Sequence, residues 1–294
     1  MNDLTVVSVF FNPAQFKQPI KNFELYAENL YKNNIPLITV GLDFGDKSCG
    51  VKTDYKLKSH SIMWQKECLI NYALERVKTK YFAWVDADLL FPDGWYEQTL
   101  EKLEINNIVQ LFKRVVYLPK GHTVYTGERI QLLQGIIWQY KTHKNWLKRR
   151  LVKDLNFAAP GFAWAAHTSL FPNGLYDKCI SGSGDTFLCD LLLGSERLHS
   201  YFGKMTDRMK EDRELFKNSL DEFKFDYLPI EIHHLQHGEL KNRNYTDRHD
   251  ILKKYEFDPQ KDIIKVDGVY EWATNKPGLR EELKNYFSER KEDE

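Results

Sequence analysis

The stretch Tyr81-Phe82-Ala83-Trp84-Val85-Asp86-Ala87-Asp88 decides the fold, because five apolar residues run directly into two acids. The apolar part has the length and composition of a buried strand. Side chains two positions apart in an extended segment point the same way, so both carboxylates face one cleft. Carboxylate oxygens suit Mg²⁺ or Mn²⁺ next to a diphosphate. A pair of surface acids that simply follows a strand would give the same pattern.

The residues around this stretch alternate between two kinds of pattern. Strand-like runs at 4–11, 36–42 and 81–90 alternate with helical patterns at 23–33 and 63–78. This order predicts an α/β fold with a parallel sheet covered by helices. In such sheets the ligand crevice lies beyond the carboxyl ends of the strands. Candidate site residues therefore follow the strands, at Phe11-Asn12-Pro13, 43–46 and 86–88.

Composition limits the location and the partners of the chain. It has 294 residues, 42% of them apolar, and 42 Lys and Arg balance 42 Asp and Glu, so the net charge predicts no polyanionic partner. The four cysteines show no metal-type spacing, which favours free thiols in a reducing cytoplasm. The N-terminus lacks the features of a signal peptide, and no apolar run reaches the roughly 18 residues of a transmembrane segment. We expect a cytoplasmic protein.

Two stretches outside the first half bear on organisation. We expect one domain over residues 1–257 and a helical appendage over 258–294 packed on it, whose helix ends over 288–294 with its last residues frayed. Residues 120–153 contain eight Lys or Arg, one acid and interleaved aromatics. They form either a solvated amphipathic helix with its aromatics packed inward or a basic surface for an anionic acceptor, such as nucleic acid or a phosphorylated glycan.

Three histidines gather in five residues, at His233, His234 and His237. His234 and His237 stand three positions apart. Imidazole suits Mn²⁺ better than Mg²⁺, so carboxylates joined by these rings favour manganese. The alternative is a set of histidines bonded to backbone carbonyls, or a pH-sensitive surface.

A glycine-containing loop, Ile180-Ser181-Gly182-Ser183-Gly184-Asp185-Thr186, delivers one carboxylate before an apolar run. Asp185 could accept the proton of an attacking hydroxyl, or it could cap the helix that follows. The small glycines next to it would let a substrate approach the backbone closely.

Together these motifs resemble a known family. The blocks follow in the order Phe11-Asn12-Pro13, Trp64-Gln65-Lys66, Val85-Asp86-Ala87-Asp88, Pro160-Gly161-Phe162-Ala163-Trp164, Gly182-Ser183-Gly184-Asp185 and His234-Leu235-Gln236-His237. This order resembles the GT-A glycosyltransferases, in particular the branch of the β-1,4-galactosyltransferases and polypeptide N-acetylgalactosaminyltransferases and its bacterial and phage relatives. The resemblance covers about residues 4–250. It implies a Rossmann-like nucleotide-diphospho-sugar transferase fold with a mixed, mostly parallel central sheet.

The resemblance also implies roles for individual residues. Phe11, Asn12, Lys66, Asp86, Gly161, Trp164 and Gly184 would form the nucleotide-sugar site; Asp88, His237 and His234 would bind the metal; Asp185 would be the catalytic base. The chain departs from the family at two points. Gly184 stands where the family's Gly-Gly-Glu-Asp block has an acid, and Lys66 replaces an arginine, which keeps the charge but loses the planar fork.

The resulting hypothesis is a metal-dependent glycosyltransferase. It would use Mn²⁺, with Mg²⁺ as the alternative, to move a sugar from a nucleotide diphosphate donor, UDP-linked in most relatives, to a hydroxyl acceptor. That acceptor would be a surface glycan or a modified nucleic acid. The stereochemistry and the oligomeric state stay open. The rival hypotheses are a metal-dependent nucleotidyltransferase or phosphoesterase, and a non-catalytic sugar-binding protein.

Overall fold

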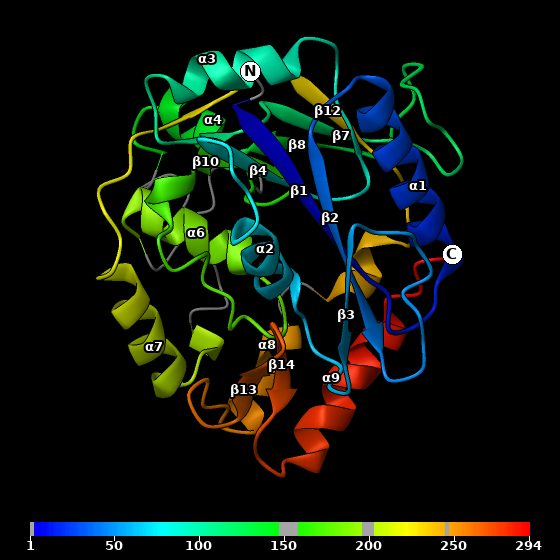
Figure 1. Ribbon diagram of the computed structural model, residues 1–294, viewed down its shortest axis with the longest axis vertical. Helices are drawn as coiled ribbons and strands as arrows, with labels where there is room; N and C mark the ends of the chain where they lie inside the picture. Colours follow the sequence, from blue (N-terminus) through cyan, green and yellow to red (C-terminus); the bar gives the residue numbers. More distant parts are fainter. Residues whose placement is uncertain (1–2, 147–157, 196–202, 245–246) are drawn as a thin grey trace.

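A seven-stranded sheet forms the centre of the molecule (Figure 1). The structure, a computed structural model, describes residues 3–146, 158–195, 203–244 and 247–294. The strand order is β11-β6-β10-β4-β1-β2-β3. The strands are β1 (Leu4–Phe11), β2 (Leu37–Phe44), β3 (Tyr55–Ser59), β4 (Tyr81–Val85), β6 (Ile108–Gln110), β10 (Ala163–His167) and β11 (Phe225–Tyr227). Only β10 runs antiparallel to its neighbours, so the prediction of a mixed, mostly parallel sheet is confirmed.

A second sheet brings distant parts of the sequence to the end of β4. Its order is β5-β12-β7-β8-β9, with β5 (Leu89–Leu90), β7 (Arg114–Tyr117), β8 (Gln131–Gly135), β9 (Ala158–Ala159) and β12 (Glu231–His234). Strand β5 follows Asp88 directly and pairs antiparallel with β12, so that Leu89 lies opposite His234. The backbone N–H of Leu235 donates to the carbonyl oxygen of Asp88 at 2.8 Å. This pairing places the histidines next to the second acid of the Asp-x-Asp pair.

Helices cover both faces of the central sheet. The helices of the described residues are α1 (Lys17–Lys32), α2 (Lys66–Leu74), α3 (Trp95–Leu103), α4 (Ile136–Thr142), α6 (Gly184–Leu193), α7 (Asp207–Lys217), α8 (Arg248–Lys254) and α9 (Pro277–Glu289), with short 3₁₀ turns at Thr168–Leu170 and Leu240–Arg243. Figure 1 shows α2 and α6 next to each other across one face of the sheet. The helical patterns expected at 23–33 and 63–78 correspond to α1 and α2.

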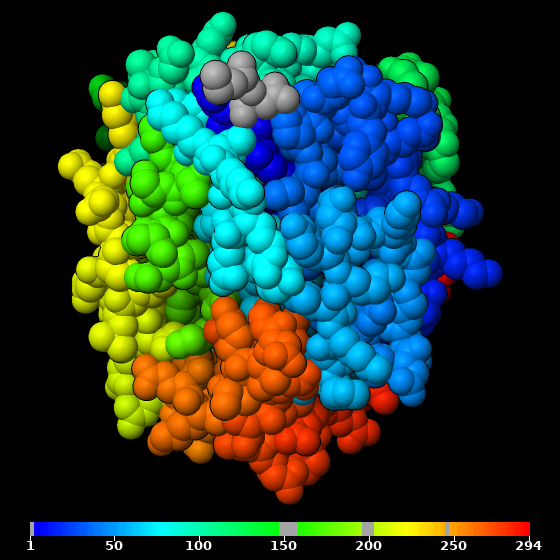
Figure 2. All heavy atoms as spheres, in the orientation of Figure 1, coloured from blue at the N-terminus to red at the C-terminus, as the bar shows by residue number. Residues whose placement is uncertain are grey.

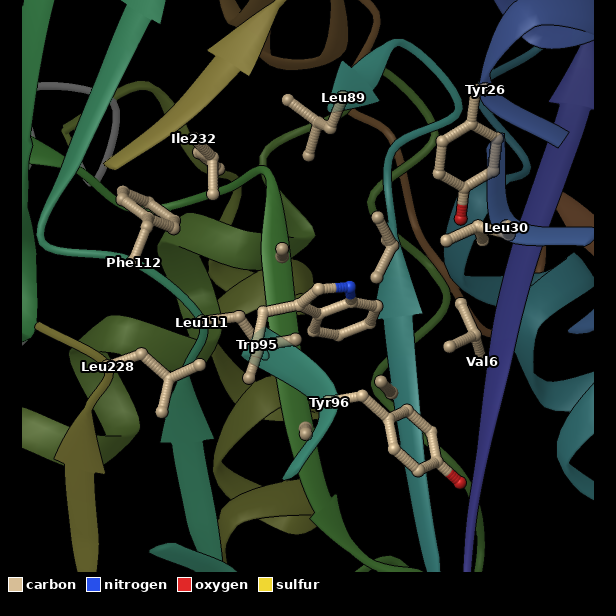
Figure 3. Packing of buried hydrophobic residues seen from close by; sticks show 14 of the residues in the cluster. Val6, Tyr26, Leu30, Leu89, Trp95, Tyr96, Leu111, Phe112, Leu228 and Ile232 are labelled. Atoms are coloured by element: carbon tan, nitrogen blue, oxygen red, sulfur yellow. The ribbon is translucent and has the colours of Figure 1, made fainter. Parts of the chain in front are cut away.

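The alternation of side chains along β4 produces two hydrophobic cores. Ala83 and Val85 point into one core, whereas Phe82 and Trp84 point into the other, as the two-residue period of a strand requires. In the first core, Trp95 of α3 lies between Val6 and Tyr26 on one side and Phe112 and Ile232 on the other (Figure 3). The second core packs α2, α4 and α6 against the opposite face. Burial on both faces makes β4 a rigid support for the acids that follow it.

The C-terminal residues 258–294 form a hairpin as well as a helix. Strands β13 (Ile263–Val266) and β14 (Val269–Trp272) pair antiparallel across the expected Asp267-Gly268 turn, and α9 follows. The hairpin and α9 share a core with Met63 and Cys68. In Figure 2, the C-terminal residues 258–294, coloured orange to red, form the lower end of the molecule. The domain boundary at residue 257 stays a prediction. The helix ends at Glu289, and the residues after it are not frayed as expected, because Arg290 is buried, Glu292 lines a cavity and Asp293 bonds to the start of α1.

The basic stretch is helical only in part. Residues 136–142 form α4 and 131–135 form β8, whereas Lys148, Arg149 and Arg150 lie outside the described residues. The four cysteines are free and buried, as expected. Within the described ranges, no helix has both the length and the hydropathy needed to cross a membrane.

Candidate active site

A cavity of about 1000 Å³ lies at the carboxyl ends of β1 and β4. Nine of the predicted site residues line it: Phe11, Asn12, Lys66, Asp86, Asp88, Gly161, Asp185, His234 and His237. The other two lie behind its wall. Trp164 is buried, stacks on Trp84 and donates its indole N–H to the carbonyl oxygen of Pro160 at 2.9 Å. Gly184 begins α6 and packs against Glu67.

The first acid of the pair is held by a lysine. Asp86 Oδ1 lies 2.5 Å from Nζ of Lys66, the first residue of α2. Burial acts to lower the pKa of Lys66, but the carboxylates of Asp86, Asp185 and Glu67 outweigh it and hold that pKa above its usual value. The lysine is therefore charged and balances Asp86 within the cavity.

The second acid faces the two imidazoles. Asp88 Oδ2 lies 2.8 Å from Nε2 of His237 and 3.5 Å from Nε2 of His234. Burial acts to raise the pKa of Asp88, but the two histidines and Arg243 outweigh it and lower that pKa. Burial lowers the pKa of His234 to about 3, so this ring is neutral at physiological pH and offers a nitrogen lone pair.

His237 has charged neighbours on both ring nitrogens. Nδ1 lies 3.2 Å from Oε1 of Glu292, and Nε2 faces Asp88. Arg243 donates to the carbonyl oxygen of His237 at 3.2 Å and lies 2.9 Å from Nε2. Burial and Arg243 act to lower the pKa of His237, but Glu292 and Asp88 raise it overall.

These three side chains fit a divalent cation. One ligand atom from each of Asp88, His234 and His237 lies within 4.8 Å of the others. Neighbouring ligands of an octahedral ion, each about 2.1 Å from it, are about 3 Å apart, close to the separations from Asp88 Oδ2. Asp88 Oδ1 and His234 Nδ1 are buried and have no hydrogen-bond partner among the described residues. One carboxylate and two imidazoles form a donor set that suits Mn²⁺.

Asp185 also lines the cavity, from the first turn of α6. The helix begins at Gly184, so Asp185 is its second residue and not its N-cap. Its Oδ2 occupies the space next to Gly161, where a Cβ atom would lie only 2.0 Å away. Two residues of α8 hold the loop that precedes Asp185. His249 bridges the hydroxyls of Ser181 and Ser183 at 3.0 Å each, and Arg248 donates to the Ser183 hydroxyl at 2.8 Å.

Glu67 is a cavity residue that the sequence analysis did not single out. Its carboxyl group fills the space over Gly184, where a Cβ atom would lie 2.4 Å from Oε1. Burial, with a contribution from Asp185, raises the pKa of Glu67 to about 7 against the effect of Lys66. Its position directly after the block Trp64-Gln65-Lys66 was the available signal.

Aromatic rings and arginines complete the cavity. Trp64 packs edge-on against Phe11 at 5.2 Å and stacks with Phe287 at 6.2 Å. The guanidinium of Arg290 lies 5.2 Å from the Trp64 ring centre. Asn12 lines the cavity, but its side chain is bonded to the backbone of Phe16 ahead of α1.

Several cavity residues come from the C-terminal part of the chain, namely Arg243, Arg248, Phe287, Arg290 and Glu292. Most of them lie beyond the point near residue 250 where the family resemblance ends. Charged residues are mostly exposed to solvent, so no sequence pattern predicted that these residues line the cavity.

Comparison with known proteins covers part of the chain. That part matches a family of glycosyltransferases, the class that the resemblance implied. The similarity in sequence lies in residues 59–169, which match glycosyl transferase family 2 and include Lys66, Asp86, Asp88 and Gly161. No curated protein matches the sequence.

Solved structures of similar fold include three glycosyltransferases. Glucosyl-3-phosphoglycerate synthase from Mycobacterium tuberculosis, solved with Mn²⁺, UDP and phosphoglyceric acid, is 12% identical over 87% of this chain and 78% of its own, with a TM-score of 0.42. S. aureus TarS 1–349 is 9% identical over 85% and 65%, with a TM-score of 0.45. The catalytic domain of Drosophila β1,4-galactosyltransferase 7 is 12% identical over 64% and 59%, with a TM-score of 0.31.

Proposed function

We propose that the chain transfers a sugar from a UDP-linked donor to a hydroxyl group, with Mn²⁺ held by Asp88, His234 and His237. The observation that carries this proposal is the meeting of these three side chains in a cavity that Asp185 also lines. When bound, the cation neutralises the charge that develops on the leaving diphosphate. Mg²⁺ is the alternative ion.

The chain's own groups support the same donor. Helices α2 and α6 both begin at the cavity, and the N-terminal ends of helices carry partial positive charge that favours phosphate. Lys66 adds a fixed positive charge within contact of Asp86. The rings of Phe11 and Trp64 provide an apolar surface for the planar base. We assign Gly161 to the sugar side of this site, whereas Gly184 lies behind the wall and makes room for Glu67.

Asp185 is the group we assign to the acceptor. Its carboxylate would take the proton of the acceptor hydroxyl as that oxygen bonds to the anomeric carbon. The bond from the anomeric carbon to the diphosphate then breaks, and its electron pair leaves with UDP. This step inverts the configuration. A retained configuration in the product would require a different role for Asp185.

The acceptor we propose is a glycan hydroxyl, with hydroxymethylated bases of nucleic acid as the second candidate. The basic residues at 120–146 favour the second candidate only weakly, because Lys120 already donates to the backbone of Asp293. Transfer assays with both acceptor classes separate the two.

The metal and donor are tested by thermal shift with a panel of UDP-sugars, with and without Mn²⁺. A ligand at one hundred times its Kd stabilises the folded state by about 2.7 kcal/mol, which raises Tm by roughly 5 °C for a chain of this size. Asp88→Ala should abolish this Mn²⁺-dependent shift. Asp93→Ala, which removes an exposed acid a few residues away, is the matched control and should keep it.

Product analysis tests the reaction class. Release of intact UDP together with transferred sugar supports the proposal. UMP or inorganic phosphate as the product would indicate a nucleotidyltransferase or phosphoesterase. Donor binding without turnover across the acceptor panel would indicate a sugar-binding protein. Mn²⁺-dependent UDP release that survives Asp88→Ala would refute the metal site.

A further inference from the structure

The C-terminal segment Arg290–Glu294 folds back from the end of α9 onto the histidine cluster. The turn is made at Lys291, whose φ of 48° is left-handed. The segment then packs against Gly238, where a Cβ atom would lie 3.0 Å from Cα of Glu292. Gly238 itself has a φ of 61°, so both its conformation and its lack of a side chain allow this approach.

The position of this segment is fixed from a second side. Asp293 Oδ1 accepts hydrogen bonds from the backbone N–H groups of Lys17 and Gln18, both at 2.7 Å, at the start of α1. The N-terminal end of a helix favours a carboxylate, so this contact is electrostatically matched. The preceding residue, Glu292, is thereby directed into the cavity.

Glu292 is an ionised carboxylate with two cationic or protonated partners. Only 12% of its side chain is exposed. Arg290 donates to Oε1 through Nε at 2.9 Å and through a second guanidinium nitrogen. A carboxylate paired with a guanidinium in this way accepts hydrogen bonds, and Oε1 also lies 3.2 Å from Nδ1 of His237.

A carboxylate faces each ring nitrogen of His237, Glu292 at Nδ1 and Asp88 at Nε2. A histidine that binds a metal must be neutral, with one N–H and one lone pair. A cation between Asp88 and Nε2 would take the lone pair of Nε2, so the remaining N–H would be at Nδ1. The carboxylate of Glu292 is placed to accept that N–H and to fix the orientation of the ring.

We propose that Glu292 is a positioning residue of the metal site, which orients His237 through Nδ1 so that Nε2 is presented to the cation next to Asp88. Arg290 holds the carboxylate in this position. The inference rests on the proposed function, because it assumes that Asp88 and His237 bind a metal. It adds that the end of the chain, more than fifty residues after His237, belongs to the metal site.

The test measures Mn²⁺ binding directly, by isothermal titration calorimetry on the full chain without nucleotide sugar. Removing the partner of a metal-bound histidine typically weakens metal binding 10- to 100-fold. Glu292→Gln, which keeps the shape and removes the charge, should raise the Kd for Mn²⁺ by roughly that factor. Glu289→Gln removes one exposed negative charge three residues away and should bind Mn²⁺ as the unchanged chain does.

Two further measurements separate orientation from folding. Glu292→Gln should keep the thermal unfolding profile of the metal-free protein, and saturating Mn²⁺ should restore UDP release. A simple loss of structure would not respond to added metal. A second variant, Glu292→Ala, should bind at least as weakly as Glu292→Gln.

The outcomes distinguish this inference from the proposed function. If the unchanged chain binds Mn²⁺ and Asp88→Ala does not, while both Glu292 variants bind with the unchanged Kd, the role of Glu292 is refuted and the metal site stands. If the unchanged chain binds no Mn²⁺, both proposals fail. Weakened binding in the Glu292 variants alone, with Glu289→Gln unaffected, supports the inference.

Discussion

Adding one methyl group at Gly161 should displace the proposed base. A Cβ atom at this position would lie 2.0 Å from Oδ2 and 3.1 Å from Cγ of Asp185. Favourable contact between such atoms begins at about 3.4 Å, so the carboxylate must move by about 1.4 Å. Gly161 does not have a left-handed backbone, so alanine fits the local conformation and the collision with Asp185 is the main effect.

The size of the effect follows from this displacement. A misplacement of about 1 Å in a reacting group can cost roughly 100-fold in rate, which corresponds to about 2.7 kcal/mol in the activation free energy. Gly161→Ala should therefore lower kcat for UDP release by about 100-fold. The Kd for Mn²⁺ should not change, because Asp88, His234 and His237 do not contact this position.

The assay is UDP release at saturating donor and Mn²⁺, with calorimetry on the same preparation. Gly203→Ala is the matched control, since a Cβ atom there meets nothing within 4 Å. Asp185→Asn should lower kcat at least as much as Gly161→Ala. A folded Gly161→Ala protein with the original kcat would refute the assignment of Asp185 as the proton acceptor in its observed position.

Two further predictions concern stability. Glu67 has a pKa of about 7 in the folded chain, against 4.5 for the free side chain. Because the folded state binds this proton more tightly than the unfolded state, the contribution of Glu67 to the free energy of unfolding falls by about 3 kcal/mol as the pH rises from 4.5 to 7. Between pH 5 and 8, the free energy of unfolding measured in urea should therefore fall less for Glu67→Gln than for the unchanged chain. An equal loss in both proteins would contradict this. Thr206 caps α7 by accepting from the backbone N–H of Met209 at 3.2 Å and also donates to the carbonyl oxygen of Phe257. Thr206→Ala should therefore cost about 1 kcal/mol, a fall in Tm of roughly 2 °C, whereas Thr126→Ala in an exposed loop should leave Tm unchanged.

The local parts of the fold were predictable because their signals are local. The apolar runs of β1, β2 and β4, and the helical pattern of α2, depend on residues a few positions apart, and the structure has these elements where the sequence placed them. The family resemblance added the order of the blocks. The turn at Asp267-Gly268 was also predictable, because an Asp-Gly pair favours the left-handed conformations that both residues take there.

The pairing of β5 with β12, which assembles the site, could not be predicted from local sequence patterns. Strand β5 has only two residues, too few for any period, and its partner β12 lies far along the chain. Their pairing depends on the packing of the second sheet against the first core. The inward position of Glu292 could not be predicted from the sequence for a different reason. A charged residue near a chain end is usually solvated, and only the contacts with Gly238 and Arg290 bring it inside.

The two acids of the Asp-x-Asp pair can be assigned different roles from their neighbours alone. Asp86 is balanced by Lys66, and burial together with the adjacent Asp88 raises its pKa even against that lysine. Asp88 is held ionised by its histidines, yet its Oδ1 has no hydrogen-bond partner among the described residues. A buried oxygen without a donor costs free energy that a bound cation would recover. These differences support the proposal that Asp88 binds the cation together with His234 and His237, while Asp86 and its lysine contact the donor.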